Sequence, residues 1–395
     1  MYAAPQVIRH RCGHRLPEPR LARRSICSRL VTELRLAVVG VGDVAQRDYL
    51  PELHRLAGRA RLVAISSRSP ERVRAVAERY PVALATTDVA EILACEDVDA
   101  VLNLTPFDAH VGVTLAALRA GKHVYSEKPL APDTAAAAQI REEAQRRGLV
   151  VVAAPSVLVF PQVRRAAEIA ASGELGPIHS ARGHGLGGVP PWDGYASDPA
   201  PFFARGGGPL RDMAVYPLHA LTGILGPVRR VAALGRRTRS SFVPQDGPAA
   251  GREIPVEVPD NWRLLVEHEG GALSSVEADN CAAGAAAPEL ELRGEAGVVA
   301  VSLLDMTEPV RVLEPGGSWR VEQPQHPRPA GPDHVLGVEE LVACAQSGRP
   351  TVLSVEHALH VIEVLEAAAV SDAEGATVAV RSSFPGRAAS AVAVP

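Results

Sequence analysis

The chain has very little lysine. Of the 41 Lys and Arg residues in its 395 positions, only Lys122 and Lys128 are lysine. Guanidinium stays charged at any working pH, whereas an amine can be tuned to release its proton, so a lysine kept against this bias is a candidate for proton transfer. We expect Lys122 to be a solvated turn residue, because charged turn residues are normally exposed, and Lys128 to be the functional one.

Other scarcities exclude whole classes of protein. The five cysteines lie far apart and form no CxxC pair, which favours free thiols in a reducing, cytoplasmic compartment and argues against a disulfide framework or a zinc site. No apolar run is long enough to cross a bilayer. The net charge of −4 gives no general attraction to nucleic acid or to an acidic membrane. We predict neither of these partners and no bound metal.

The N-terminal residues differ from the rest. Residues 1–31 hold seven arginines, one acidic residue and no hydrophobic periodicity, and Arg23-Arg24 resembles a twin-arginine signal. The next apolar run, Leu34–Val44, is interrupted by charges and fits a strand and its turn better than a signal core. We predict a disordered extension over residues 1–33, or an upstream mis-assigned start with Val31 as the initiator; a targeting arm is the remaining alternative.

A nucleotide-binding turn follows the first predicted strand, Leu34–Val39. The segment from Gly40 to Ala45 has the form GxGxxA and leads into a helical pattern through about Leu56. In such turns the first glycine permits a tight bend, the second lets the backbone approach a pyrophosphate, and the small third residue lets helix pack on strand. The free N–H groups of the helix N-terminus favour phosphate. We predict that Gly40, Gly42, Asp43, Val44 and Ala45 bind a dinucleotide.

The end of the second strand, Arg61–Ser66, bears on the choice of cofactor. An NAD-selective site usually has Asp or Glu at this position, whereas this chain has Ser67 and then Arg68. A guanidinium can bind a 2′-phosphate with two hydrogen bonds, so Ser67, Arg68 and Arg72 favour NADP over NAD. The alternative is that Arg68 is a solvated turn residue and that either cofactor binds.

Alternating strands and helices continue to residue 153 and predict a parallel sheet with helices on both faces, a Rossmann domain over residues 34–153. Ligands bind beyond the carboxyl ends of such strands. The residues placed there are Thr105, Pro106, Glu127 and Lys128, and His110 lies in the first turn of the predicted helix Ala109–Ala120 that follows the first two. We predict that they contact the cofactor.

From residue 154 to 395 the pattern predicts a second α/β domain. Five runs with alternating polarity, the first at Val228–Leu234 and the last at Val298–Leu303, indicate a mostly antiparallel sheet with one covered face. A loop over residues 183–208 carries Trp192, Tyr195 and Phe202, which we predict to form an apolar wall against the substrate. The alternative is that these rings only pack the loop.

A second polar group follows three glycines. The spacings of Asp212, Tyr216 and His219, four and three residues, predict one face of a single helix that opens at Gly206-Gly207-Gly208. A face that mixes carboxylate, phenol and imidazole needs partners, so we predict these three to be catalytic together with Lys128. A satisfied buried network remains the alternative.

Two motifs give the chain a family resemblance over about residues 34–380. The segment from Ala120 to Pro129 matches AGKHV-x-x-EKP, and Gly206 to Tyr216 matches GGG-x-x-x-D-x-x-x-(H/Y). The chain thereby resembles the Gfo/Idh/MocA family (glucose–fructose oxidoreductase, inositol dehydrogenase, MocA). The resemblance implies a Rossmann domain, a second domain with an open-faced sheet, and a homodimer or homotetramer formed through that sheet.

The resemblance also implies hydride transfer between nicotinamide and a secondary alcohol or ketone of a sugar, cyclitol or related polyol. Lys128 would contact cofactor and substrate, Asp212 would orient one of them, and Tyr216 would be the acid/base, with its pKa lowered by the Lys128 ammonium. Proton exchange by Lys128 itself, with Tyr216 only aligning the substrate, stays open. The alternative function is a dinucleotide- and sugar-sensing regulatory protein without turnover.

Overall fold

The computed structural model describes residues 33–192, 194–286, 288–324 and 330–385. The predicted N-terminal extension lies outside these ranges except for Glu33, so it stays a prediction. No helix in the described part of the chain is long and apolar enough to cross a membrane.

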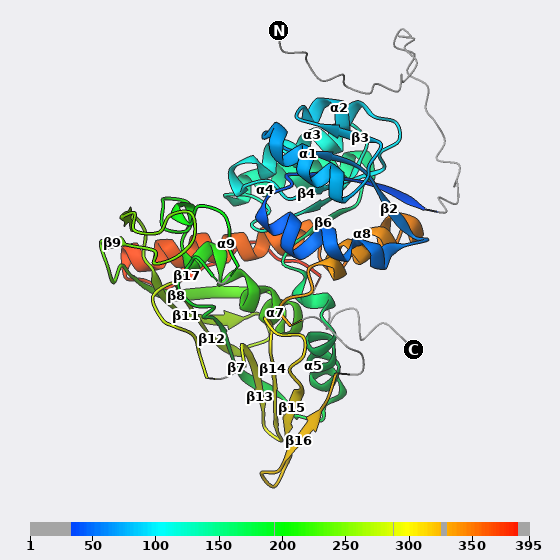
Figure 1. The fold of residues 1–395 in the computed structure, drawn as a ribbon. Coiled ribbons are helices and arrows are strands. Elements are labelled where there is room, and N and C mark those ends of the chain that lie inside the picture. Colours follow the sequence, from blue (N-terminus) through cyan, green and yellow to red (C-terminus); the bar gives the residue numbers. More distant parts are fainter. Residues whose placement is uncertain (1–32, 193, 287, 325–329, 386–395) are drawn as a thin grey trace, which may run out of the picture. The chain divides into compact units, whose positions relative to one another are not determined.

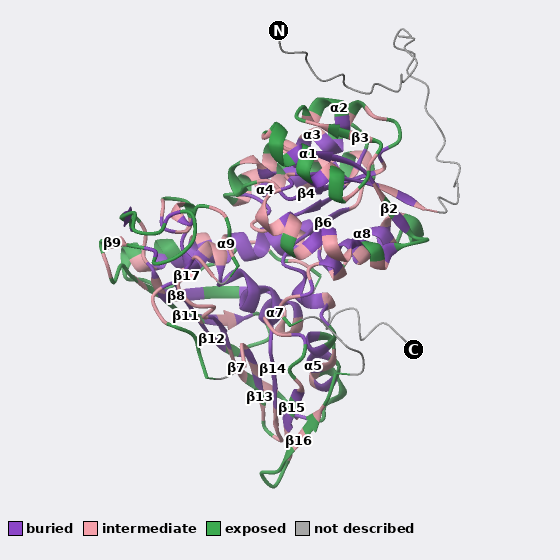
Figure 2. Cartoon of the chain, viewed as in Figure 1, coloured by how far each residue is buried: buried purple, intermediate pink, exposed green. Residues whose placement is uncertain are grey.

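The first sheet has six parallel strands in the order β3-β2-β1-β4-β5-β6, the order of a dinucleotide-binding Rossmann sheet. Figure 1 shows this part of the chain in blue to cyan. Its strands are β1 (Leu34–Val39), β2 (Ala60–Ser66), β3 (Leu84–Thr86), β4 (Ala100–Asn103), β5 (His123–Ser126) and β6 (Val151–Ala153). Strands covered on both faces need apolar side chains at nearly every position, and the central strands are buried almost throughout (Figure 2). The predicted Rossmann sheet is therefore confirmed.

The connecting helices alternate with the parallel strands, as the sequence predicts. They are α1 (Pro70–Arg79), α2 (Val89–Ala94), α3 (His110–Arg119) and α4 (Thr134–Arg147), with the short η3 (Phe107–Ala109) before α3. Ser69 caps α1, because its hydroxyl accepts a hydrogen bond from the Arg72 N–H at 3.2 Å.

The helical stretch after the nucleotide turn is irregular. It consists of a π-helical turn, η1 (Ala45–Tyr49), followed by a 3₁₀ segment, η2 (Leu50–Leu56). Pro51 has no N–H to donate to the preceding turn, so a regular α-helix cannot continue through it. The predicted extent to Leu56 is confirmed, but the helix type is not the one the pattern suggests.

The second sheet has nine strands in the order β16-β15-β14-β13-β7-β12-β11-β8-β17, and only the β7–β12 pair is parallel. Its strands are β7 (Ile178–Gly185), β8 (Val228–Arg236), β11 (Asn261–His268), β12 (Leu273–Asp279), β13 (Leu290–Gly294), β14 (Val298–Val301), β15 (Val310–Leu313), β16 (Trp319–Glu322) and β17 (Val378–Ala379). A separate two-stranded ribbon joins β9 (Ser241–Phe242) to β10 (Ile254–Pro255). The mostly antiparallel sheet is confirmed. The sequence patterns did not predict β7, which is rich in glycine, or the strands β15, β16 and β17.

Helices cover one face of this sheet. They include α5 (Pro161–Ser172), against β14 and β15, and α7 (Val215–Leu225), against β7, with the short η4 (Ser156–Val159) nearby. The opposite face leaves Leu234, Leu265 and Leu273 on neighbouring strands 58–73% exposed.

The C-terminal helices return to the first sheet. Helix α8 (Val335–Ser347) packs against β5 and β6, and α9 (Val355–Glu374) lies between α4 and β8. Apolar residues of α9, among them Val355 and Leu359, belong to the same core cluster as Ala37 of β1. The predicted boundary after residue 153 therefore coincides with the end of the last parallel strand, β6. Helix α9, from beyond that boundary, completes the hydrophobic core on one face of the parallel sheet.

The helix predicted to carry Asp212, Tyr216 and His219 on one face is broken in two. Helix α6 (Pro209–Asp212) ends at Asp212, and α7 begins three residues later at Val215. The N–H of Ala214 bonds the carbonyl of Pro209, five residues back, at 2.9 Å. Pro217 has no N–H with which to continue the α-helical ladder across the break. Asp212 therefore does not share a helix face with Tyr216.

The prediction for Lys122 is wrong. The residue is only 8% exposed, and its ammonium donates hydrogen bonds of 2.7 Å to the carbonyl oxygens of Cys95 and Val98. Burial is the main cause that lowers the pKa of this amine. Lys122 therefore ties the end of α2 to the start of β5.

Candidate functional site

One cavity collects almost all of the predicted site residues. Its volume is about 1810 Å³, whereas pockets for a single small ligand hold roughly 300–1,000 Å³. It therefore has room for a dinucleotide and a second molecule. The predicted residues that line it are Gly40, Gly42, Asp43, Val44, Ser67, Arg68, Arg72, Thr105, Pro106, His110, Glu127, Lys128, Trp192, Tyr195, Phe202, Asp212 and Tyr216. Ala45 and His219 are not among the lining residues.

The nucleotide turn has the geometry that its glycines suggest. Gly40 has φ +94°, and a Cβ there would lie 2.6 Å from the backbone of Leu104 and Thr105, so only glycine fits. A Cβ at Gly42 would meet no atom within 4 Å and would project into open space beside the turn. Ala45 is completely buried, which fits its expected role in packing helix on strand. The turn thus leaves free the approach that a pyrophosphate requires.

Two guanidinium groups close to the end of β2, on Arg68 and on Arg72 of α1, have no partner among the described residues. Arg68 and Arg72 line the cavity and are exposed, and neither side chain makes a hydrogen bond or ion pair with another described residue. No carboxylate occupies position 67. This part of the cavity can therefore accept an anionic group.

His110 joins the loops that follow β4 and β5. Its ring nitrogens lie 2.7 Å from the carbonyl oxygen of Pro129 and 2.8 Å from that of Thr105. The Thr105 hydroxyl in turn donates to the Asn103 side chain at 2.7 Å. His110 is 1% exposed, so it holds these two strand ends together within the cavity wall.

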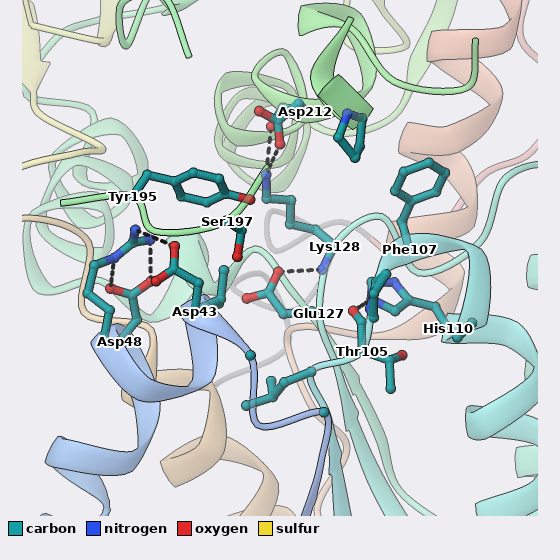
Figure 3. A pocket seen from close by; sticks show the side chains of 18 of the residues that line it. Asp43, Asp48, Thr105, Phe107, His110, Glu127, Lys128, Tyr195, Ser197 and Asp212 are labelled. Carbon is teal, nitrogen blue, oxygen red and sulfur yellow. Dashed lines mark hydrogen bonds and ion pairs between the residues drawn. The ribbon is translucent and has the colours of Figure 1, made fainter. Parts of the chain in front are cut away.

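Lys128 meets Asp212 across the cavity (Figure 3). The ammonium forms an ion pair with the Asp212 carboxylate and also donates to the Asp212 backbone carbonyl at 3.0 Å. Burial opposes the charge on Lys128, but Asp212, Tyr216 and Glu127 outweigh it and raise the pKa of the amine. The other Asp212 carboxylate oxygen is buried and has no hydrogen-bond partner among the described residues, so it can accept a bond from a ligand.

Tyr216 lies under the same ammonium, with Lys128 Nζ 5.1 Å from the centre of its ring. Burial raises the pKa of Tyr216, Lys128 lowers it, and the carboxylates of Glu127 and Asp212 raise it again, to about 12. Lys128 lowers the pKa of Tyr216 as expected, but burial and the two carboxylates raise it by more. Tyr216 therefore holds its proton at neutral pH in this structure.

His219 shares α7 with Tyr216 but points into the core. Its Nδ1 lies 2.8 Å from the carbonyl oxygen of Val215, and its ring packs on that of His357, with 4.9 Å between centroids. Burial lowers its pKa to about 4. Three residues along a helix offset two side chains by about 60° around the axis, and here that offset moves His219 off the cavity wall.

Sequence reasoning missed the residues that support Glu127. One oxygen of this carboxylate accepts a hydrogen bond from the Tyr49 hydroxyl at 2.5 Å, and the other accepts the Lys128 N–H at 2.8 Å. Burial works against ionisation, but His334, Lys128 and these bonds together lower the pKa of Glu127. The Tyr49 ring stacks on His334, which comes from the segment before α8. Nothing in the sequence links position 49 with position 334.

The family models for this fold match most of the described chain. Residues 34–154 match the oxidoreductase family with an NAD-binding Rossmann fold, GFO_IDH_MocA, and residues 163–300 match the GFO/IDH/MocA C-terminal domain. The chain belongs to the Gfo/Idh/MocA oxidoreductase family. The Gfo/Idh/MocA Rossmann match contains both the nucleotide turn and the Glu127-Lys128-Pro129 segment.

Among Gfo/Idh/MocA relatives, the chain is 33% identical over 202 residues to a dTDP-3,4-didehydro-2,6-dideoxy-alpha-D-glucose 3-reductase from Streptomyces violaceoruber, covering 51% of this chain and 57% of that protein. It is 32% identical over 151 residues to an inositol 2-dehydrogenase from Corynebacterium glutamicum, covering 38% and 44%. The chain thus aligns with only about half the length of these curated relatives.

Solved structures extend the likeness to the whole fold. An oxidoreductase domain protein from Kribbella flavida superposes with a TM-score of 0.77 at 23% identity, covering 89% of this chain and all of that one. Levoglucosan dehydrogenase in complex with NADH and levoglucosan superposes with a TM-score of 0.76 at 22% identity, covering 88% and 99%. At these identities the likeness concerns the Gfo/Idh/MocA fold.

Proposed function

We propose that the protein is an NAD(P)-dependent oxidoreductase acting on a secondary alcohol or ketone of a sugar, cyclitol or related polyol. One observation carries the proposal: Lys128, Asp212 and Tyr216 come from separate elements and meet in one cavity beside the nucleotide turn. The substrates named for the reductase and inositol dehydrogenase relatives belong to the same chemical class.

Two features of the nucleotide turn and its surroundings fit a bound dinucleotide. Open space beside Gly42 admits the pyrophosphate, and the strand ends at Thr105 and Glu127 face the same cavity. A bound nicotinamide would supply the hydride chemistry, and the protein would supply geometry and a proton route.

In the mechanism we propose, the ion pair orients the reacting oxygen. Lys128 donates a hydrogen bond to the carbinol or carbonyl oxygen, and the unpartnered Asp212 oxygen accepts one from a neighbouring hydroxyl. Tyr216 keeps its proton at neutral pH, so it can act as a general acid on a carbonyl. For alcohol oxidation Tyr216 must first lose that proton, which the adjacent ammonium favours.

A screen of polyols with both cofactors tests this function. Glucose, myo-inositol and levoglucosan are each incubated with NADP+ and with NAD+, and the absorbance of reduced cofactor is followed. We expect turnover of at least one polyol, a loss of most of it in Tyr216→Phe, and normal turnover in Tyr80→Phe, which changes a tyrosine outside the cavity. Polyol binding without turnover would instead support the sensing protein, and near-normal turnover in Tyr216→Phe would remove its acid/base role.

For the cofactor we propose a preference for NADP. The support is the absence of a carboxylate at Ser67 and the two uncommitted guanidinium groups of Arg68 and Arg72. A charge-assisted bond to a phosphate contributes about 1.5–3 kcal/mol, so Arg68→Ala should weaken NADPH binding by about tenfold or more and leave NADH binding nearly unchanged. An unaltered ratio of the two dissociation constants contradicts the preference.

We also propose that the protein forms a homodimer or homotetramer through the open face of its second sheet. Three exposed leucines, Leu234, Leu265 and Leu273, lie there on adjacent strands. Leu265→Arg should then shift the sedimentation coefficient toward that of a monomer. A cytoplasmic location is consistent with the free thiols of Cys95, Cys281 and Cys344.

A further inference from the structure

The aromatic loop, residues 194–208 together with Trp192, contributes more than an apolar wall. The rings of Trp192, Tyr195 and Phe202 contact one another edge to face, with centroids 4.9–6.1 Å apart. All three line the cavity. Tyr195 is the member of this trio that carries a hydroxyl.

The Tyr195 hydroxyl points into the part of the cavity that holds Lys128 and Asp212 (Figure 3). Ser197, on the same loop, also lines this cavity. Burial, then the carboxylates of Asp43 and Asp212, raise the pKa of Tyr195, while Arg47 and Ser197 lower it. The phenol therefore stays protonated and available as a donor beside the ion pair.

The loop is bonded directly to the nucleotide turn. The N–H of Ala196, the residue after Tyr195, donates to the Asp43 carboxylate at 3.1 Å. Asp43 occupies the position after the second glycine of the turn and also lies 3.9 Å from the Arg47 guanidinium. The negative charge of the Asp43 carboxylate repels a pyrophosphate. We therefore expect this side chain to hold the loop and not to contact the cofactor.

The other end of the loop is held by a separate excursion of the chain. This excursion is the segment of residues 237–260, which connects β8 to β11. Strands β8 and β11 are antiparallel neighbours that pair Arg236 with Asn261, so a short turn would be enough to join them. Part of this excursion packs on Phe203, which is 1% exposed, in a small cluster with Ala249, Ile254 and Val256. Anchors at both ends thus fix where Tyr195 lies.

We propose that Tyr195 is a substrate-positioning residue that donates a hydrogen bond from Oη to an oxygen of the bound polyol, and that Asp43 keeps it in place through Ala196. The inference rests on the proposed function, since it assumes a polyol between the loop and Lys128. It assigns Tyr195 a polar role and assigns Asp43 to the loop.

The test separates substrate affinity from chemistry and from cofactor binding. With the best polyol from the screen, Tyr195→Phe should raise KM and the calorimetric polyol Kd about three- to tenfold, because one neutral hydrogen bond is lost. It should change kcat less than twofold and leave the NADPH Kd unchanged. Tyr80→Phe is the matched control, because it removes a phenol hydroxyl outside the cavity.

Two variants of Asp43 test the link to the loop. Asp43→Ala removes the acceptor for the Ala196 N–H and should raise the polyol KM as Tyr195→Phe does, without weakening NADPH binding. Asp43→Asn keeps an oxygen acceptor at the same place and should restore most of the lost affinity. In the double variant Asp43→Ala/Tyr195→Phe the two effects should not add, because both remove the same contact.

The two proposals fail in different ways. If the wild-type protein turns over a polyol, and Tyr195→Phe has the same polyol KM and Kd as the wild type, the inference is overturned and the proposed function stands. If Asp43→Ala weakens NADPH binding tenfold with an unchanged polyol KM, Asp43 serves the cofactor and the link to the loop is refuted. If no polyol is bound or turned over with either cofactor, the proposed function fails and the inference fails with it.

Discussion

Replacing Lys128 by Gln should reveal how strongly its ammonium controls Tyr216. The charge lies 5.1 Å from the centre of the tyrosine ring, over which a phenolate spreads its own charge. At that distance two unit charges attract by about 3 kcal/mol with an effective dielectric constant near 20, equivalent to about two pH units. Lys128→Gln should therefore push the pKa of Tyr216 upward from about 12.

The assay is the pH dependence of kcat/KM for alcohol oxidation between pH 7 and 10, where Tyr216 is mostly protonated. Because the ionised fraction falls tenfold for each pH unit added to the pKa, oxidation should drop about a hundredfold in Lys128→Gln at every pH in this range. Lys128→Arg keeps a positive charge beside the ring. If only the charge matters, Lys128→Arg should regain most of the lost rate.

The same pair of variants decides between the two acid/base candidates. If Lys128 exchanges the proton itself, Lys128→Arg should be as inactive as Lys128→Gln while NADPH still binds, because guanidinium does not release a proton. Tyr216→Phe would then remain active. An oxidation rate in Lys128→Gln that stays within threefold of the wild type would refute the electrostatic reasoning as a whole.

Three further predictions concern the glycines of the nucleotide turn, Lys122 and His219. Gly40→Ala should lower the melting temperature because its Cβ would lie 2.6 Å from backbone atoms, whereas Gly42→Ala should leave the melting temperature unchanged and weaken NADPH binding. Lys122→Met leaves one buried and one partly buried carbonyl without a hydrogen bond and should cost about 2–5 kcal/mol in denaturant unfolding, a loss that an unchanged midpoint would contradict. Burial lowers the pKa of His219 to about 4 and that of His357 well below its usual value, so the unfolded chain binds more protons below about pH 6.5. Stability should fall as the pH drops from 6.5 toward 4, and His219→Leu should make that fall shallower in thermal melts.

The Rossmann half could be predicted from sequence because its signals are local. Strands β1 and β4 are apolar runs, and the turn between β1 and η1 needs glycine at position 40 for a steric reason that the motif encodes. The positions of Thr105 and Lys128 follow from topology, since parallel strands place their carboxyl ends along one edge. Each inference needed only a short stretch of sequence and one general rule.

The remaining parts of the site depend on contacts that a periodic pattern cannot encode. The reading of one helix from Asp212 to His219 assumed 3.6 residues per turn without interruption, and Pro217 was the available signal against it. Because the helix breaks, Asp212 turns toward Lys128 while His219 turns into the core. The contact of Tyr49 with His334 joins residues that are separated by most of the chain, and only the packed structure reveals it.

The scarcity of lysine also needs a different explanation from the one that the sequence suggests. Both lysines are largely buried, and each ammonium binds two oxygen atoms. A compact ammonium fits such a site, whereas a planar guanidinium with five donors would leave hydrogen-bonding groups unpaired. Burial alone thus explains why lysine is kept at both positions, and the rarity of lysine does not by itself identify a catalytic residue. What distinguishes Lys128 from Lys122 is its partner. Within the described residues Lys122 binds only backbone carbonyls, while Lys128 binds a carboxylate whose second oxygen has no partner there and lies in a cavity large enough for a ligand. The catalytic proposal for Lys128 therefore depends on Asp212, and a Lys122→Arg variant should impair folding without changing the kinetics of the protein that does fold.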